Sequence, residues 1–360
     1  MIPPAALLEL LTELVNCRSD QREEALVALL APRLESWGAR ITVREVAPGR
    51  PNLIATFSGR DPARSLMLEA HSDTVGGDAP FSASVRDGRL YGRGACDTKG
   101  PMAAILLGLR EVLAQDGRPP VTVHFVSTCN EELGATGAHA LMASGFRVDA
   151  AVAGEPTELR IVHAHKGALR VNLVTEGVAV HSSEPSRGVN AIYKMRAVLE
   201  ALETRVLPDL ARVRHPLLGS PVLSVGTIRG GTQVNVVPAR CEIEVDRRLV
   251  PGESSETAVA QMVAGLEVRA EVSGYYPPLE QDRESAVARA VAAACQRTLG
   301  NAEFATAPYA TNAGVFAAAG IPCVVFGPVA AAQAHTRDEF IELAQVETAA
   351  RVFAALIRRN

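Results

Sequence analysis

The sequence predicts an α/β fold, with a mostly parallel central sheet that is interrupted by an inserted α+β domain. Three observations support this. Four short apolar runs, each bounded by turn residues, are typical of buried parallel strands. Helical patterns alternate with these runs, and residues 168–274 show a different order of elements. A chain of 360 residues also exceeds one ordinary core and suggests about two domains.

The first of these observations rests on strands and helices that alternate along the chain. The apolar runs are "SLMLEA" at 65–70, "VTVHFVST" at 121–128, "AAVAG" at 150–154 and "CVVFG" at 323–327. The strongest helical patterns cover 22–38, 100–115, 284–300 and 346–359. Alternation of this kind indicates an open parallel sheet wrapped by helices.

The inserted segment has its own order of elements, which is strand, helix, strand, strand, helix and strand. They are expected at 169–177, 189–206, 221–231, 240–249, 254–266 and 267–275. This is the split β-α-β order of ferredoxin-like domains. We therefore expect a discontinuous α/β domain at 1–167 and 275–360, with an inserted domain at 168–274.

Both chain crossings carry a glycine, Gly167 and Gly274, which would permit hinge-like backbone changes. The four-stranded sheet of the insert would keep open edges, and pairing between subunits is one way to protect them. The sequence leaves monomer and dimer both open.

Composition excludes several classes of protein. The hydrophobic content of 48% and the formal net charge of −4 predict a soluble globular protein and give no basic surface for nucleic acid. No apolar run reaches membrane-spanning length, and residues 1–15 resemble an amphipathic helix more than a signal peptide. The six cysteines show no C-x-x-C spacing, so we expect reduced thiols and a cytoplasmic location.

Acidic and histidine residues follow the predicted strands. These residues are His71, Asp73, Glu131, Glu132, Glu155 and, after a short loop, His335. Ligands of open parallel sheets bind at the carboxyl ends of the strands, where all of these residues would lie. Asp97 joins them from a glycine-rich turn before the helix at 100–115. The simpler alternatives are a solvated turn for Glu131 and Glu132 and helix capping by Asp97 or Thr98.

Two imidazoles and three carboxylates form a ligand set for two divalent metal ions that share one bridging carboxylate. The candidate ligands are His71, Asp97, Glu132, Glu155 and His335. Mixed nitrogen and oxygen donors suit zinc, and cobalt or manganese are chemically compatible. One of the adjacent glutamates would bind metal while the other accepts a proton from activated water, and the residues alone do not say which.

Asp73 follows His71 by two residues, on the same face of an extended segment. Its carboxylate can accept the second imidazole N–H and so fix the tautomer of His71. Three other histidines, His124, His139 and His215, are expected to pack in the core or to face solvent.

The motifs resemble a known family, the co-catalytic two-zinc peptidases and deacylases. Its members include acetylornithine deacetylase, succinyl-diaminopimelate desuccinylase, aminoacylase and glutamate carboxypeptidase. The matching stretches are "EAHSDTV", "YGRGACDTKGPMAA", "NEELGATGA", "GEPTEL", "HSSEPSRGVNAI" and "AHTRDEFI". They occur in family order over nearly the whole chain, so the resemblance is specific. It implies that 1–167 and 275–360 form the catalytic domain, which holds the two metal ions, and that 168–274 form a lid or dimerisation domain.

The resemblance assigns roles that the residues alone leave open. It implies that His71 and Glu155 hold one metal ion, that Glu132 and His335 hold the other, and that Asp97 bridges them. It also implies a cis peptide between Asp97 and Thr98, Glu131 as the general base, and Asp73 as the partner of His71.

In the insert, the resemblance implies that His181 reaches an active site, often that of the partner subunit, and helps to hold the developing oxyanion. It also implies that Asn235 and Arg248 contact the substrate, since arginine can bind a carboxylate bidentately. The simpler alternatives are a solvated loop histidine at 181 and a surface ion pair for Arg248. Arg247, on the opposite strand face, is an internal control.

The expected activity is metal-dependent hydrolysis of an N-acylated amino acid with a free carboxylate. Through "RIVHAHKG" and "HSSEPSRGVNAI" the chain is most similar to acetylornithine deacetylase, which implies N-acetylornithine as substrate and a step of arginine biosynthesis. The alternatives are a carboxypeptidase, a desuccinylase or another deacylase of the family, and a catalytically silent ligand-binding protein. One departure is Asn312, where many members carry an acidic residue, so a contact to substrate or to a metal ligand is expected to differ.

Overall fold

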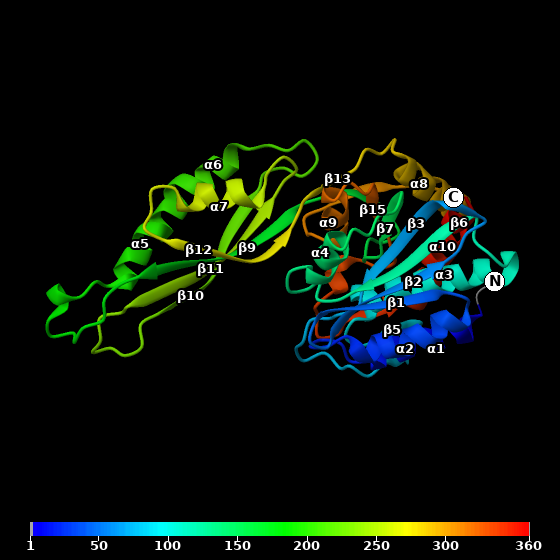
Figure 1. Cartoon of the computed structure of the whole chain (residues 1–360), viewed down its shortest axis with the longest axis horizontal. Helices are drawn as coiled ribbons and strands as arrows, with labels where there is room; N and C mark the ends of the chain where they lie inside the picture. Colours follow the sequence, from blue (N-terminus) through cyan, green and yellow to red (C-terminus); the bar gives the residue numbers. More distant parts are fainter. Residues whose placement is uncertain (1–2, 360) are drawn as a thin grey trace. The chain divides into compact units, whose positions relative to one another are not determined.

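The structure is a computed structural model that describes residues 3–359 (Figure 1). The chain divides into two compact units. The first unit runs to Ala164 and also contains Glu280–Thr306 and the chain from Thr311 onward. The second unit consists of His165–Leu279 and Ala307–Ala310. The second unit is thus inserted into the sequence of the first.

The central sheet of the first unit has nine strands within the described residues. The four predicted strands are consecutive neighbours in this sheet, and each adjacent pair is parallel. In sheet order they are β6 (Val121–Thr128), β3 (Asp61–His71), β7 (Ala150–Ala153) and β15 (Cys323–Val325). Their carboxyl ends therefore meet at one edge of the sheet, which is where the candidate residues were expected.

Further strands that we did not predict extend this sheet on both sides. The hairpin of β1 (Arg40–Ala47) and β2 (Arg50–Phe57) adds antiparallel to β6, and β8 (Ile161–His165) adds antiparallel to β15. Two short strands, β13 (Leu279–Glu280) and β14 (Phe304–Ala307), pair with β8. The sheet is therefore mixed, with a parallel centre.

Helices cover the sheet and bury most of the core. They are α1 (Pro4–Asn16), α2 (Glu24–Ser36), α3 (Gly100–Asp116), α4 (Thr136–Ala143), α8 (Ala286–Leu299), α9 (Asn312–Ala318) and α10 (Leu343–Arg359). The side chains of α3 are buried from its first residue to Leu109, and α10 packs along it (Figure 1). A Cβ atom on Gly108 would lie 2.5 Å from the carbonyl oxygen of Ala350, so this glycine permits the close approach of the two helices.

A small antiparallel sheet joins two loops of the first unit. It consists of β4 (Ser84–Arg86), β5 (Arg89–Tyr91) and β16 (Phe340–Glu342), with β5 in the middle. Strand β5 leads into the loop that carries Asp97, and β16 follows the loop that carries His335. The pairing of β5 with β16 thus holds these two distant segments together.

The second unit is an antiparallel sheet in the order β10–β11–β9–β12, as in ferredoxin-like domains. Its elements are β9 (Gly167–Glu176), α5 (Ala191–Ala201), β10 (Val222–Gly230), β11 (Arg240–Leu249), α7 (Ser255–Val263) and β12 (Arg269–Tyr276). Burial alternates along β11, which is typical of a strand with one buried face. The predicted fold, with a parallel α/β sheet and a ferredoxin-like insert, is confirmed.

The predicted helix at 189–206 differs at both ends. It begins at Ala191, because the side chain of Asn190 caps it by accepting hydrogen bonds from the backbone N–H groups of Ile192 and Tyr193. After Ala201 the chain continues through a π-helical segment (Leu202–Val206) into α6 (Leu207–Arg212).

Gly167 allows close backbone packing at the start of β9. A Cβ atom there would lie 2.6 Å from the carbonyl oxygen of Tyr276, so a larger residue does not fit. Among residues 3–359, no helix is both long and apolar enough to cross a membrane. All six cysteines are free thiols.

Candidate metal centre

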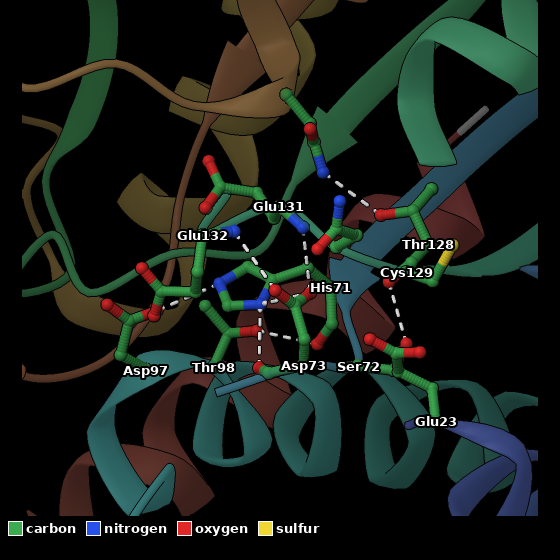
Figure 2. A network of polar contacts seen from close by, with 12 residues as sticks. Glu23, His71, Ser72, Asp73, Asp97, Thr98, Thr128, Cys129, Glu131 and Glu132 are labelled. Atoms are coloured by element: carbon green, nitrogen blue, oxygen red, sulfur yellow. Dashed lines mark hydrogen bonds and ion pairs between the residues drawn. The ribbon is translucent and has the colours of Figure 1, made fainter. Parts of the chain in front are cut away.

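The candidate residues of the first unit gather at the carboxyl edge of its parallel strands. His71 is the last residue of β3, Glu131 and Glu132 lie in the turn after β6, and Glu155 follows β7 by two residues. Asp97 precedes α3, and His335 lies in the loop after β15. Figure 2 shows the side chains of His71, Asp97 and Glu132 converging, with the turn of Glu131 beside them.

Asp97 lies between the two histidines. Its Oδ1 is 2.9 Å from Nε2 of His71, and its Oδ2 is 3.3 Å from Nε2 of His335. Each histidine also faces a glutamate, since Oε1 of Glu132 is 3.0 Å from His335 Nε2 and Oε1 of Glu155 is 4.0 Å from His71 Nε2. Ligand atoms of His71, Asp97 and Glu132 all lie within 4.8 Å of one another. The two carboxylate oxygens of Asp97 thus face two different histidines, each of which also faces a glutamate.

The site concentrates negative charge in a poorly hydrated space. Burial raises the pKa values of Glu131 and Glu155 well above their usual range, and neighbouring carboxylates add to the effect. Burial disfavours the charged form of His71, but its contacts with Asp73 and Asp97 outweigh this and raise its pKa. Hydrogen bonds to Asp97 and Glu132 raise the pKa of His335 to about 10. An acidic cluster that attracts positive charge this strongly, with imidazole nitrogens directed into it, fits divalent cations.

Asp73 holds the turn that carries the two glutamates. Its carboxylate accepts hydrogen bonds from the backbone N–H of Glu131 at 2.8 Å and of Glu132 at 3.0 Å (Figure 2). The acceptor nearest to Nδ1 of His71 is the backbone oxygen of Asp73 at 3.0 Å, and the carboxylate Oδ1 lies 3.5 Å away. Asp73 therefore contacts both His71 and the glutamate turn, whereas the sequence suggested only the histidine contact.

The peptide between Asp97 and Thr98 is cis, as the resemblance implied. Thr98 donates a hydrogen bond from Oγ1 to the backbone oxygen of His71 at 2.9 Å. Neither Asp97 nor Thr98 caps α3, which has no side-chain capping bond at its start. The capping alternative is therefore not what the structure shows.

Asn312 is fully buried at the start of α9. Its Nδ2 donates to Oε1 of Glu69 at 2.9 Å and to Oγ1 of Thr128 at 3.0 Å. Glu69 precedes His71 by two residues and is itself 1% exposed. The departure at position 312 therefore concerns a buried polar network with Glu69 on β3 and Thr128 on β6. Within residues 3–359, the side chain of Asn312 makes no hydrogen bond to a candidate ligand.

Two of the three candidates in the second unit lie side by side within it. His181 forms a β-bridge with Val236, and the backbone N–H of Ser182 donates to the carbonyl oxygen of Asn235 at 3.0 Å. His181 and Asn235 are both exposed. The insert therefore presents an imidazole and an amide from neighbouring loops.

Arg248 makes the ion pair that was the simpler alternative. Its guanidinium donates to both carboxylate oxygens of Asp246, at 2.8 and 3.2 Å. Arg247, on the other strand face, is buried with Glu253 and Gln261. The two neighbouring arginines thus differ in environment, because Arg247 is buried inside the unit and Arg248 is half-buried at its surface.

The three remaining histidines that we considered are consistent with packing or solvent contact. His124 lies on β6 with its Nδ1 3.1 Å from Oγ1 of Thr56, His139 lies on α4, and His215 forms a β-bridge with Gly219.

Comparison with known proteins extends over nearly the whole chain. The sequence profile of peptidase family M20/M25/M40 matches residues 67–359. The acetylornithine deacetylase of Proteus mirabilis (strain HI4320) is 33% identical, over 95% of this chain and 91% of that protein.

Solved structures share the fold. A metallo-carboxypeptidase of family M20 from Sulfolobus solfataricus is 20% identical, with a TM-score of 0.82 and coverage of 98% of both chains. A dinuclear metal-binding peptidase of the same family from Bacillus subtilis is 19% identical, with a TM-score of 0.70 over 99% of this chain and 98% of that one. The profile match and the similarity to the Proteus protein establish that the chain belongs to peptidase family M20/M25/M40 and is a metallohydrolase of that family.

Proposed function

We propose that the protein is a two-metal amidohydrolase that removes the acyl group from an N-acylated amino acid, with N-acetylornithine as its substrate. The observation that carries the proposal is the carboxylate of Asp97 between two histidines, with the Glu131 and Glu132 turn beside it. The 33% identity to an acetylornithine deacetylase supports the choice of substrate.

In this proposal each metal ion has its own histidine and glutamate. His71 and Glu155 would hold one ion, His335 and Glu132 would hold the other, and Asp97 would be shared by both. Divalent cations bound there supply Lewis acidity, which polarises an amide carbonyl and makes water a better nucleophile. Zinc is the proposed metal, and cobalt would serve in reconstitution.

Glu131 is the proposed general base. Its side chain is buried, and burial favours its protonated form, with the neighbouring carboxylate of Glu132 adding to this. A carboxylate with a raised pKa can accept the proton of the attacking water and return it to the departing amine nitrogen. Asp73 would keep this carboxylate in place, since it holds the backbone N–H of Glu131.

The insert would supply substrate contacts. We assign His181 to the developing oxyanion, where one additional hydrogen-bond donor typically contributes about 3 kcal/mol to the transition state. Asn235 and Arg248 are assigned to the substrate, and Arg248 would exchange its partner Asp246 for the substrate carboxylate.

The insert also offers a surface for a second copy of the chain. Strand β10 is an edge strand and leaves Val222 and Ile228 exposed, and Tyr193 at the start of α5 is 74% exposed. A surface groove of about 850 Å³ lies between α5 and the loop that contains Val234. Exposed apolar residues beside an open sheet edge favour pairing between subunits, and we propose a homodimer through this unit.

Metal-dependent release of amine from N-acetylornithine is the expected outcome of a direct assay. Protein stripped with a chelator should be inactive, and zinc or cobalt should restore turnover. The measurement is amine release from a panel that includes N-acetylornithine, N-succinyl-diaminopimelate, other N-acylated amino acids and dipeptides.

The panel tests the choice of substrate separately from the proposal that the protein is a hydrolase. Faster metal-dependent turnover of another compound would overturn N-acetylornithine and keep the chemistry. Two bound metal ions with no turnover of any compound would overturn the hydrolase proposal in favour of ligand binding.

Mixed dimers are expected to reveal whether His181 acts on the partner subunit. Neither His181→Ala nor Glu131→Ala homodimers should show substantial activity. Random mixing should restore about a quarter of the wild-type activity, because half of the dimers are mixed and each of these has one complete site. Sedimentation would first establish the dimer. Mixed dimers isolated from coexpressed subunits with different tags should then show about half of the wild-type activity, because one of their two sites is complete.

The matched control is His215→Ala, which removes a half-buried loop histidine of the same unit and should leave activity unchanged. Activity of the mixed dimers no greater than the average of the two parents would show that His181 does not act across the interface.

A further inference from the structure

The first observation concerns the strand pairing that precedes Asp97. Strand β5 pairs with β16 in the register Tyr91 to Phe340. The pairing continues by one residue beyond both strands, since the backbone N–H of Gly92 donates to the carbonyl oxygen of Glu339 at 3.0 Å. Glu339 is therefore placed opposite the start of the loop that carries Asp97.

Glu339 uses its side chain to hold the backbone of that loop. Its Oε1 accepts a hydrogen bond from the N–H of Cys96 at 2.9 Å and from the N–H of Asp97 at 3.1 Å. Its Oε2 accepts a hydrogen bond from Nη1 of Arg93 at 2.7 Å. Both carboxylate oxygens are thus engaged with the segment 93–97.

Burial makes these contacts energetically important. Glu339 is 1% exposed and Arg93 is 3% exposed, and an ion pair in such a place is stable only when both partners are present and well hydrogen-bonded. Nη1 of Arg93 also donates to the backbone oxygen of Thr336 at 3.3 Å. Arg93 and Glu339 therefore connect the Asp97 loop to the segment that begins at His335.

The packing of β16 fixes the position of Glu339 further. Ile341 lies against the start of α3, where a Cβ atom on Gly100 would be only 2.0 Å from its Cδ1. Ile341 is itself fully buried. The buried packing of Ile341 therefore fixes the backbone next to Glu339. The Glu339 carboxylate connects this backbone to the Asp97 loop, which is about 240 residues away in the sequence.

We propose that Glu339 is a positioning residue that fixes Asp97 and His335 relative to one another and so sets the affinity of the centre for its metal ions. The inference rests on the proposed metal centre. Glu339 resembles Asp73 in its contacts. The carboxylate of each accepts hydrogen bonds from two consecutive backbone N–H groups, Glu339 in the Asp97 loop and Asp73 in the turn of Glu131.

The Glu339→Gln variant tests this inference. Glutamine has nearly the same size, but its NH₂ group must face either Arg93 or the backbone N–H groups, all of which are donors. We expect metal affinity to fall by about 10–100-fold, the usual cost of losing a group that orients a ligand. The measurement is competition with a chromophoric chelator for zinc or cobalt, together with the Tm of the metal-free protein.

The matched control is Glu342→Gln. Glu342 lies three residues further along, at the end of β16, and pairs with Arg89 at the surface, where its side chain is 39% exposed. Its replacement should leave metal affinity within about twofold of wild type, because exposed ion pairs contribute little.

A second variant separates positioning from simple loss of stability. Glu339→Asp keeps the charge for Arg93 but withdraws the carboxylate from the N–H groups of Cys96 and Asp97, so its metal affinity should also fall. A merely structural role predicts a lower Tm of the metal-free protein for either variant with unchanged affinity, and that result would overturn the inference. If the wild-type protein binds no metal, the proposed function itself fails, which is a different outcome.

Discussion

Replacing Glu131 with glutamine is expected to lower kcat by about 10²–10⁴-fold, the range that a positioned general base contributes. Glutamine keeps the shape of the side chain but cannot accept a proton at neutral pH. The ligand atoms of His71, Asp97 and Glu132 remain, so metal binding should persist. Steady-state kinetics and metal analysis of the same preparation check both parts of this prediction.

The neighbouring residue provides the comparison. Glu132 contacts His335, and Glu132→Gln should reduce the amount of bound metal as well as activity. The two substitutions are thus expected to differ in bound metal, which Glu131→Gln protein keeps and Glu132→Gln protein partly loses. Wild-type turnover by metal-loaded Glu131→Gln protein would rule out the proposed base.

Asp97→Asn is expected to weaken both metal sites at once. The carboxylate faces both histidines, and the amide replaces one of its oxygens with an NH₂ group that cannot bind metal. Turnover should fall by more than the about 10²–10³-fold that loss of a single stabilising donor costs. Metal content after dialysis against buffer with a weak chelator is the decisive measurement.

Asp116→Asn is the control for this change, since Asp116 ends α3 and pairs with Arg358 in a partly exposed position. It should keep full metal content. Retention of two metal ions at wild-type affinity by Asp97→Asn protein would show that Asp97 does not bridge them.

The sequence predicted the parallel centre of the sheet because its strands lie in continuous apolar runs bounded by turn residues. It did not predict β13, β14 or β16, which have two to four residues and lie in no continuous apolar run. The hairpin at 40–57 was also missed. Its signal was present, because an alternating run and an apolar run flank a turn that contains Gly49.

The residues of the candidate centre could be proposed because side-chain chemistry at strand ends is visible in a sequence. The carboxylates that hold backbone N–H groups were not visible in this way. Glu339 follows His335 by only four residues, but its partners are the N–H groups of Cys96 and Asp97, and only the folded chain brings them together. The burial of Asn312 against Glu69 likewise depends on packing between α9 and the sheet, so the substitution alone indicated a difference without its location.

The insertion of one unit into the other has a consequence for biosynthesis. About 190 residues separate β7 from α10, and the whole second unit lies between them. At about 5–20 residues per second, the ribosome needs about 10–40 s to synthesise this stretch. Until then α3 lacks the helix that covers it and the acidic loops lack His335, so the nascent first unit exposes apolar surface. The main segment of the second unit, His165–Leu279, is by contrast complete before α10 is synthesised.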